Sequence, residues 1–181
     1  MAKYNHSFEN YNQEKMARAV GRDLGISTKQ SIEICSTIRN KGITAAKRIL
    51  EKAIELKEPI EYKRFRNGIG HKRGHMASGA FPVKASTAIL KVINNAEANA
   101  QEKGLNSELL KIVHVCAHKA STPMHGGRQR RSVFKRSHVE IVLAEVSKKK
   151  KLSEKKVEEA KPATPKVEEA KPETPKEEQK W

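Results

Sequence analysis

The sequence predicts an α+β protein with one folded domain and two appendages. Three stretches have the features of helices, and residues 109–146 have a strand-like arm at each end. A chain of 181 residues is close to the usual size of one domain. We therefore expect an N-terminal arm at residues 1–15, a domain at residues 16–146 and a tail at residues 147–181.

The arm is polar, and we expect its spaced aromatic residues Tyr4, Phe8 and Tyr11 to fold onto another surface. Residues 16–26 are predicted to form a short strand. Its apolar edge would contain Ala17, Ala19 and Leu24. A helix is expected next, because Ser27 and Gln30 match a capping box, in which the serine side chain accepts a hydrogen bond from the third helical amide. It would end near residue 40. Its predicted buried residues are Ile34, Cys35 and Ile38.

Two further helices are predicted from apolar residues at helical spacing. The second would start near Thr44 and stop before Pro59, because proline interrupts a helix. Its apolar positions are Ala45, Ala46, Ile49, Leu50 and Ala53. The third would have Pro82 in its first turn, end at Gly104 and pack on the sheet that the hairpin forms. Its apolar positions are Ala85, Ala88, Ile89, Val92, Ile93, Ala96 and Ala100.

Residues 109–146 are predicted to form an extended β-hairpin. Alternate residues of a strand share a face. The apolar residues that alternate in this way are Val113, Val115 and Ala117 on the rising arm, and Val139, Ile141 and Leu143 on the returning arm. Pro123 and the Gly126-Gly127 pair mark the turn. Arms of about ten residues, at ~3.3 Å per residue, would project roughly 30 Å beyond the sheet.

The tail contains a ten-residue repeat, KVEEAKPATP at residues 156–165 and KVEEAKPETP at residues 166–175. Neither copy has an apolar face, and proline recurs in both. Such a segment cannot bury enough apolar surface to fold alone. We therefore predict a disordered C-terminal tail.

The chain is strongly basic, with 37 Lys and Arg against 21 Asp and Glu and a formal net charge of +16. A polyanion or an anionic membrane surface is therefore the expected partner. The sequence lacks an apolar run long enough to cross a bilayer and an N-terminal signal peptide. Two cysteines, Cys35 and Cys116, fit a reducing compartment. We expect a cytoplasmic protein with no membrane contact.

Two segments without an acidic residue, 62–75 and 118–138, contain the residues most suited to binding a polyanion. Like charges on irregular backbone repel one another unless an anion neutralises them, and the arginine fork matches phosphate. The basic residues are Lys63, Arg64, Arg66, Lys72 and Arg73 in a glycine-rich loop at residues 59–80, and Lys119, Arg128, Arg130, Arg131, Lys135 and Arg136 in the hairpin. Tyr62, Phe65 and Phe134 lie among them and suit stacking on unpaired bases. Phe65 and Phe134 fit a role as core residues equally well.

A metal site and catalysis have weaker support. His114, Cys116 and His118 would share one face of a strand and offer three metal ligands, but the pattern lacks a fourth ligand and the usual close cysteine or histidine pair. We expect instead that Cys116 is a small buried residue between two histidines that bind no metal. The glycines of residues 68–74 do not match a nucleotide-binding loop, and Asp23 is the sole aspartate of the chain. We expect no enzyme activity, metal or cofactor.

Three segments, GAFPVKASTAILKVINNAEANA, GLNSELLKIVHVCAHKA and KRSHVEIVLAE, occur in this order. Together they resemble the large-subunit ribosomal protein family numbered twenty-two in bacteria and seventeen in eukaryotes. The insertion from Lys63 to Gly74 and the step Ala117-His118-Lys119 resemble its archaeal and eukaryotic branch, and the chain is expected to be of the archaeal type. The resemblance covers roughly residues 17–145.

The resemblance implies three helices on a small three-stranded antiparallel sheet with a long protruding hairpin. It further implies a structural protein of the large ribosomal subunit that binds its RNA, assists assembly and lines the peptide exit tunnel with the hairpin, while the body lies near the tunnel exit. Neighbouring ribosomal proteins and the nascent peptide would be its other partners. The implied RNA contacts are the basic residues of both acid-free segments and His138. The alternative is a free-standing protein that binds or compacts nucleic acid.

Overall fold

The computed structural model describes residues 4–146, which form one compact unit. The helices are α1 (Thr28–Ile38), α2 (Ile43–Ile54) and α3 (Val83–Glu102), with 3₁₀ turns η1 (Ser107–Leu109) and η2 (Gly127–Gln129). The strands are β1 (Met16–Leu24), β2 (Ile60–Glu61), β3 (Gly79–Ala80), β4 (Leu110–Lys119) and β5 (Ser137–Glu145). The predicted α+β class is confirmed, and the predicted tail lies outside the described residues.

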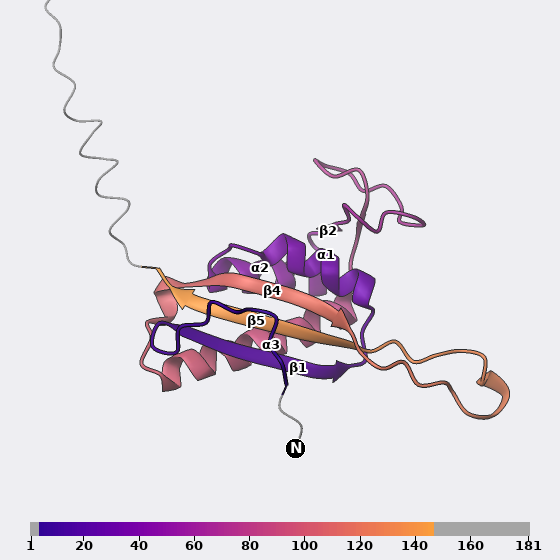
Figure 1. The fold of residues 1–181 in the computed structure, drawn as a ribbon. Coiled ribbons are helices and arrows are strands. Elements are labelled where there is room, and N and C mark those ends of the chain that lie inside the picture. Colours follow the sequence, from indigo (N-terminus) through magenta and orange to yellow (C-terminus); the bar gives the residue numbers. More distant parts are fainter. Residues whose placement is uncertain (1–3, 147–181) are drawn as a thin grey trace, which may run out of the picture. The chain divides into compact units, whose positions relative to one another are not determined.

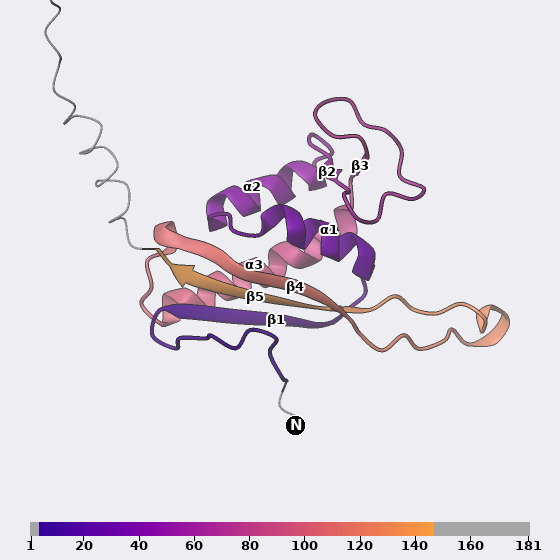
Figure 2. The same cartoon turned by 45° about the horizontal axis from the view of Figure 1, so that its top comes forward.

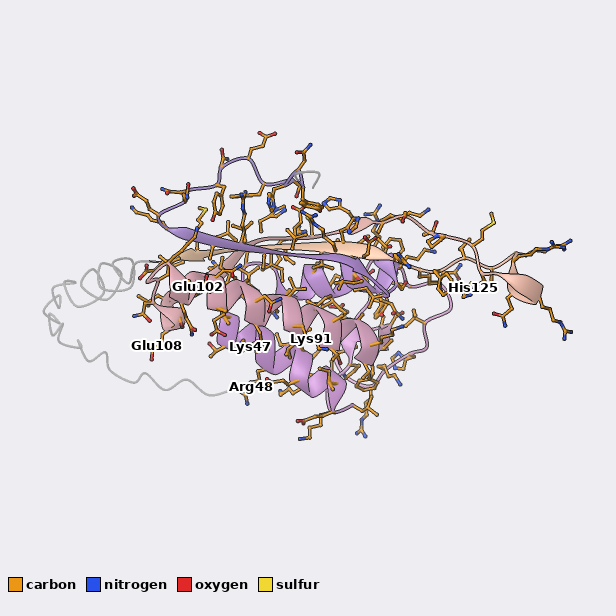
Figure 3. All side chains as sticks on the ribbon, turned by 90° about the horizontal axis from the view of Figure 1, so that it is seen from below. Lys47, Arg48, Lys91, Glu102, Glu108 and His125 are labelled. Atoms are coloured by element: carbon orange, nitrogen blue, oxygen red, sulfur yellow. The ribbon has the colours of Figure 1, made fainter. Side chains whose placement is uncertain are left out.

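The main sheet is antiparallel, with strand order β1-β5-β4. All three helices lie on one face of it, α3 against β1 and β5 and α1 against β4 (Figures 1 and 2). The N-terminal arm, residues 4–15, runs along the opposite face (Figure 3). Beyond the sheet, the chain between β4 and β5 projects as a long hairpin (Figure 1). Within residues 4–146, no helix combines the length and apolar character required to cross a membrane.

The apolar residues predicted for the helices and the returning strand form the core. Val139, Ile141 and Leu143 of β5 are fully buried beneath the helices. The predicted helical residues that are buried are Ile34, Cys35 and Ile38 in α1, Ala46, Leu50 and Ala53 in α2, and Ala85, Ile89, Val92, Ile93, Ala96 and Ala100 in α3. Ala45, which was included in the apolar set of α2, is exposed. Helical periodicity therefore located nearly all of the helical core.

The predicted face of the rising strand is wrong at Val113. Ile112 pairs with Leu143 and His114 pairs with Val142, so Val113 is the extra residue of a β-bulge. The bulge breaks the period of two. Ile112 and Val115 are therefore the fully buried residues on this part of β4, whereas Val113 is partly exposed.

The predicted capping box is also wrong. Ser27 does occupy the N-cap of α1, but its side chain makes no capping hydrogen bond. The Ser27 carbonyl instead accepts hydrogen bonds from the Ser31 amide at 2.9 Å and the Ser31 hydroxyl at 2.9 Å. Pro82 is the N-cap of α3 rather than part of its first turn. The N-termini of both helices therefore keep amides without a side-chain cap.

The outer edges of β4 and β1 are covered by other parts of the domain. The turn between α1 and α2 bonds to β4, with Ile112 donating to the Lys41 carbonyl at 2.9 Å and Asn40 donating to the Ile112 carbonyl at 3.1 Å. On β1, the Arg18 carbonyl accepts a hydrogen bond from the Asn99 side chain at 3.0 Å. These contacts fix the helical layer to both edges of the sheet.

Candidate nucleic-acid interface

The hairpin changes character where it leaves the domain. The regular ladder ends with the pairs His118 with His138 and Lys119 with Ser137. Beyond it the two arms stay loosely paired. The cross-arm bonds are Ala120 amide to Arg136 carbonyl (3.1 Å), Phe134 amide to Pro123 carbonyl (2.9 Å) and His125 amide to Ser132 carbonyl (3.0 Å). The predicted protruding hairpin is confirmed, but its outer part is an irregular ribbon rather than two regular strands.

The basic side chains of the hairpin point into solvent. Those that are exposed are Lys119, Arg128, Arg130, Arg131 and Lys135. Arg136 is partly buried. Within residues 4–146 these six side chains form no ion pair. The hairpin therefore presents a row of cations that can bind an extended anion such as a nucleic-acid backbone.

An aromatic pair lies among these cations. Phe134 stacks on His125, with 3.5 Å between ring centroids, and Phe134 is 44% exposed. Phe134 is therefore not a core residue, and it remains suited to stacking on a base. Tyr62, by contrast, is 3% exposed and belongs to the interior. Phe65 is partly buried beneath Lys29 and Arg64, whose cationic groups lie 5.7 Å and 5.3 Å from its ring centroid.

Glu33 of α1 holds the start of the basic loop. Its carboxylate is 2% exposed and accepts hydrogen bonds from three consecutive backbone amides, those of Lys63 (3.1 Å), Arg64 (2.8 Å) and Phe65 (2.7 Å). This role of Glu33 was not predicted from the sequence. One feature of the sequence could have indicated it: Glu33 is the sole acid of α1, and it lies next to buried positions.

The rest of the loop is closed by the short antiparallel pair β2 and β3, which no pattern in the sequence predicted. Lys63, Arg64, Arg66 and Arg73 are exposed, whereas Lys72 lies over the Phe81 ring, 5.5 Å from its centroid. Among the residues that the structure describes, Lys63 is the one predicted RNA contact in an ion pair, with Glu61 at 3.3 Å.

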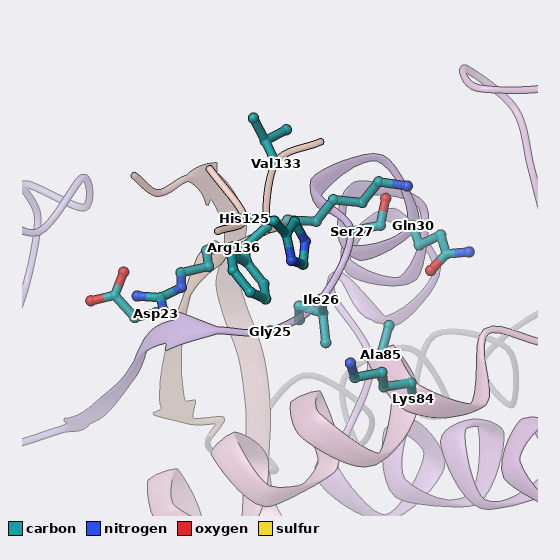
Figure 4. Close-up of a pocket in the computed structure, with 12 residues that line it drawn as sticks. Asp23, Gly25, Ile26, Ser27, Gln30, Lys84, Ala85, His125, Val133 and Arg136 are labelled. Atoms are coloured by element: carbon teal, nitrogen blue, oxygen red, sulfur yellow. The ribbon is translucent and has the colours of Figure 1, made fainter. Parts of the chain in front are cut away.

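An open groove of about 690 Å³ lies where the hairpin leaves the sheet (Figure 4). Its walls are the hairpin, with Lys135 and Arg136, and the N-terminal ends of α1 and α3, with Ser27 and Lys84. Asp23 supplies one carboxylate. The first turns of both helices contain no acid, and helix N-termini favour anions. The groove therefore extends the basic surface from the hairpin to the helices, and Lys84 is a cation there that was not among the predicted contacts.

His138, the last predicted contact, already has partners within the domain. Its Nδ1 accepts a hydrogen bond from the Asp23 amide at 3.0 Å, and Tyr4 packs edge-on against its ring. Asp23 has φ 48° at the irregularity in β1, a conformation that aspartate tolerates better than most residues. His138 therefore fixes the path of β1, and its partly buried ring has less surface for RNA than the arginines have.

On the outer face of the sheet, His114, Cys116 and Glu140 lie beneath the N-terminal arm. Burial alone would raise the pKa of Glu140, but hydrogen bonds from Tyr4 (2.6 Å) and from the amide and hydroxyl of Ser7 (3.0 and 2.7 Å) hold it below its ordinary value. Burial lowers the pKa of His114 and raises the pKa of Cys116. Cys116 is half-buried rather than fully buried.

An α+β body that exposes a basic hairpin and a basic loop is typical of proteins that bind nucleic acid through extended segments. The family model described as ribosomal protein L22p/L17e matches residues 19–144, and the chain belongs to this family. The resemblance read from the three sequence segments is thus confirmed over nearly the predicted range.

Known relatives agree. The chain is 44% identical over 153 residues to the large ribosomal subunit protein uL22 of Methanosphaera stadtmanae, covering 80% of this chain and 99% of that protein. It is 38% identical over 156 residues to the protein of the same name from Staphylothermus marinus, covering 81% and 99%. It is 39% identical over 153 residues to the large ribosomal subunit protein uL22 of Ignicoccus hospitalis, covering 79% of this chain and 96% of that protein. All three are archaeal and thus fall within the archaeal and eukaryotic branch that the insertion at residues 63–74 resembles.

Proposed function

We propose that this protein is a structural constituent of the large ribosomal subunit. It binds large-subunit ribosomal RNA, assists its assembly and lines the peptide exit tunnel with the hairpin, while the domain lies near the tunnel exit. Family membership supports the ribosomal role, and the relatives are named as large-subunit proteins. The observation that carries RNA binding is the hairpin, whose exposed basic side chains form no ion pair within residues 4–146.

The hairpin has too little structure of its own to hold this row of charges together. A two-stranded ribbon is marginally stable in water, and the arms beyond Lys119 and Ser137 share few backbone bonds. Phosphate contacts would order the ribbon as they neutralise it. Neighbouring ribosomal proteins and the nascent peptide are the remaining proposed partners, the latter at the hairpin tip. No catalytic role is proposed.

The salt dependence of binding to large-subunit RNA fragments tests the proposal. If six hairpin cations each neutralise a phosphate, the hairpin contributes about −4 to −5 to the slope of log affinity against log salt concentration. Replacing two of them in Arg130→Gln/Arg131→Gln should make the slope less steep by about 1.4 to 1.8.

Arg48→Gln/Lys91→Gln is the matched control, because it removes the same charge from exposed positions on α2 and α3 (Figure 3). It should leave the slope nearly unchanged. Equal effects of the two pairs, or a slope near zero for the unmodified protein, would show that the hairpin is not the RNA-binding element.

A further inference from the structure

The outer face of the sheet brings together side chains that bind metal ions. His114 and Cys116 lie on β4, and Glu140 lies on β5 directly opposite Cys116 in the strand register. One ligand atom from each of these residues lies within 4.8 Å of the ligand atoms of the other two. The sequence pattern had offered three ligands from one strand and lacked a fourth. Strand pairing supplies it as Glu140.

His118 lies at the edge of the same cluster. Its Nε2 is 3.1 Å from the Cys116 Sγ and 3.8 Å from a Glu140 oxygen. Ligands about 2.0 to 2.3 Å from a tetrahedral ion are separated from one another by about 3.3 to 3.8 Å. The separations from His118 to Cys116 and to Glu140 are therefore close to those in a tetrahedral site.

The Ser7 hydroxyl lies in the middle of the cluster. Its Oγ is 3.0 Å from the His114 Nε2, 3.3 Å from the Cys116 Sγ and 2.7 Å from a Glu140 oxygen. A single small polar atom thus contacts three candidate ligands at once. An ion at this position would contact the same three atoms once the hydroxyl moves aside.

The surroundings provide support for such an ion. Glu140 is 2% exposed, and Tyr4 donates to it at 2.6 Å, a hydrogen bond of the kind that orients a ligating carboxylate. Phe8 covers His114, with 5.3 Å between ring centroids. The two paired strands carry all four ligands, and the arm partly covers His114, Cys116 and Glu140, whereas His118 stays exposed.

We propose that His114, Cys116, His118 and Glu140 form a site for a divalent cation of intermediate softness, with Zn²⁺ the best match. Mixed nitrogen, sulfur and oxygen ligands are those that Zn²⁺ accepts in tetrahedral sites. The ion replaces the Ser7 hydroxyl as the centre of the cluster. Binding then ties the two strands to each other at the base of the hairpin, just before the ladder ends at Lys119.

Zinc content and affinity of the untagged full chain test the site. We expect one Zn²⁺ per chain after dialysis and at least about tenfold weaker binding in Cys116→Ser and in His114→Gln. His114→Gln replaces a partly exposed side chain, so it remains informative if the cysteine variant folds poorly. His125→Gln, which removes a histidine from the projecting hairpin, is the matched control and should bind as the unmodified chain does.

Two further readouts separate a metal site from a plain hydrogen-bond network. Zn²⁺ should slow alkylation of Cys116, and Cys35 does not interfere because it is 2% exposed. Ser7→Ala should bind Zn²⁺ at least as tightly as the unmodified chain, because it removes the group that the ion displaces. Two results would overturn the proposal: less than one Zn²⁺ per unmodified chain, or Zn²⁺ binding in Cys116→Ser and His114→Gln that is as tight as in the unmodified chain. So would a loss of binding in Ser7→Ala as large as that in Cys116→Ser.

Discussion

Glu33 is a buried acid on α1, and its hydrogen bonds to the basic loop explain why an acid occupies this position. Three consecutive amides, from Lys63 to Phe65, donate to its carboxylate. A buried carboxylate needs such partners, because an unpaired one is strongly destabilising. The same bonds set the direction in which Lys63 and Arg64 leave the domain.

Glu33→Gln should release this part of the loop. A neutral amide accepts weaker hydrogen bonds than a carboxylate, and we expect the free energy of unfolding to fall by about 2 kcal/mol. Hydrogen exchange at the amides of residues 63–65 should become faster, and RNA affinity should fall. Glu51→Gln, an exposed acid on α2, is the control and should change none of these. Unchanged exchange at residues 63–65 would contradict the role of Glu33.

Cys35 should be chemically inert in the folded protein. Burial raises its pKa from the ordinary value of 9.0 to about 12, so the reactive thiolate is scarce. In a Cys116→Ala variant, alkylation at pH 8 should require denaturant. Because the folded pKa is the higher one, the stability due to the buried thiol holds below pH 9 and declines as the pH rises towards 12. Rapid labelling without denaturant would show that the core opens locally.

Gly21 should not tolerate a larger residue. A Cβ atom there would lie 2.7 Å from a methyl group of Val92 and 2.8 Å from Leu24, so β1 and α3 can approach this closely because the side chain is absent. Gly21→Ala should lower the free energy of unfolding by about 1–3 kcal/mol. Gly126→Ala is the comparison, because nothing lies within 4 Å of the added atom. A denaturation series measures both, and equal stabilities would contradict the close contact.

Residue patterns predicted core positions better than polar ones. The burial of Ile34 and Ile38 could be predicted from helical spacing alone, because that spacing compares each residue with those three and four positions away. Glu33 bonds to residues 30 or more positions later, and Glu140 to Tyr4 and Ser7, more than 130 positions earlier. Such pairs form through the fold, so spacing in the sequence does not reveal them.

Among the elements, the hairpin consists of a root within the sheet and a projecting part beyond it. None of residues 121–132 is buried. Deleting Ser121 to Ser132 would leave Val133 to Lys135 between the bonded residues Ala120 and Arg136, a loop length common in hairpins. The root should therefore close without its projecting part.

We expect the protein with this deletion to unfold within a few degrees of the full chain in a thermal scan followed by circular dichroism. Its affinity for large-subunit RNA should fall, because Arg128, Arg130 and Arg131 are removed. A truncated protein that does not fold would show that the root depends on the projecting part.

The order and type of the long elements were predictable, whereas their local irregularities were not. All three helices and the three strands of the main sheet follow from periodicity and from glycine and proline positions. The bulge at Val113 was missed because the adjacent Ile112 bonds to the turn between α1 and α2, a contact made by tertiary packing. The basic segments of the site were predictable because the charge of a side chain can be read directly from the sequence. The groove was not, because it forms only where the hairpin, α1 and α3 come together in the fold.

For the whole molecule, the question is whether the basic surfaces serve a ribosomal subunit or a free nucleic-acid-binding protein. In a sucrose gradient of lysate from cells that make this protein, we expect it to migrate with large subunits and to remain there in moderate salt. Several basic segments on one domain would bind RNA together, so dissociation would be slow and its rate would depend steeply on the salt concentration. Migration at the top of the gradient, or with DNA, would favour the free-standing alternative.

Under the proposed function, the hydrogen-bonded edges of the sheet matter most before the protein binds RNA. Unpaired strand edges join to one another and promote aggregation. In this domain the bonds from Asn40 and Ile112 occupy the edge of β4, and the side chain of Asn99 reaches the edge of β1. A newly made copy is thereby protected from polymerising strand to strand, and its high positive charge keeps copies apart. Under the proposed function, the same hydrogen bonds that fix the helices to the sheet would limit aggregation between synthesis and assembly into the subunit.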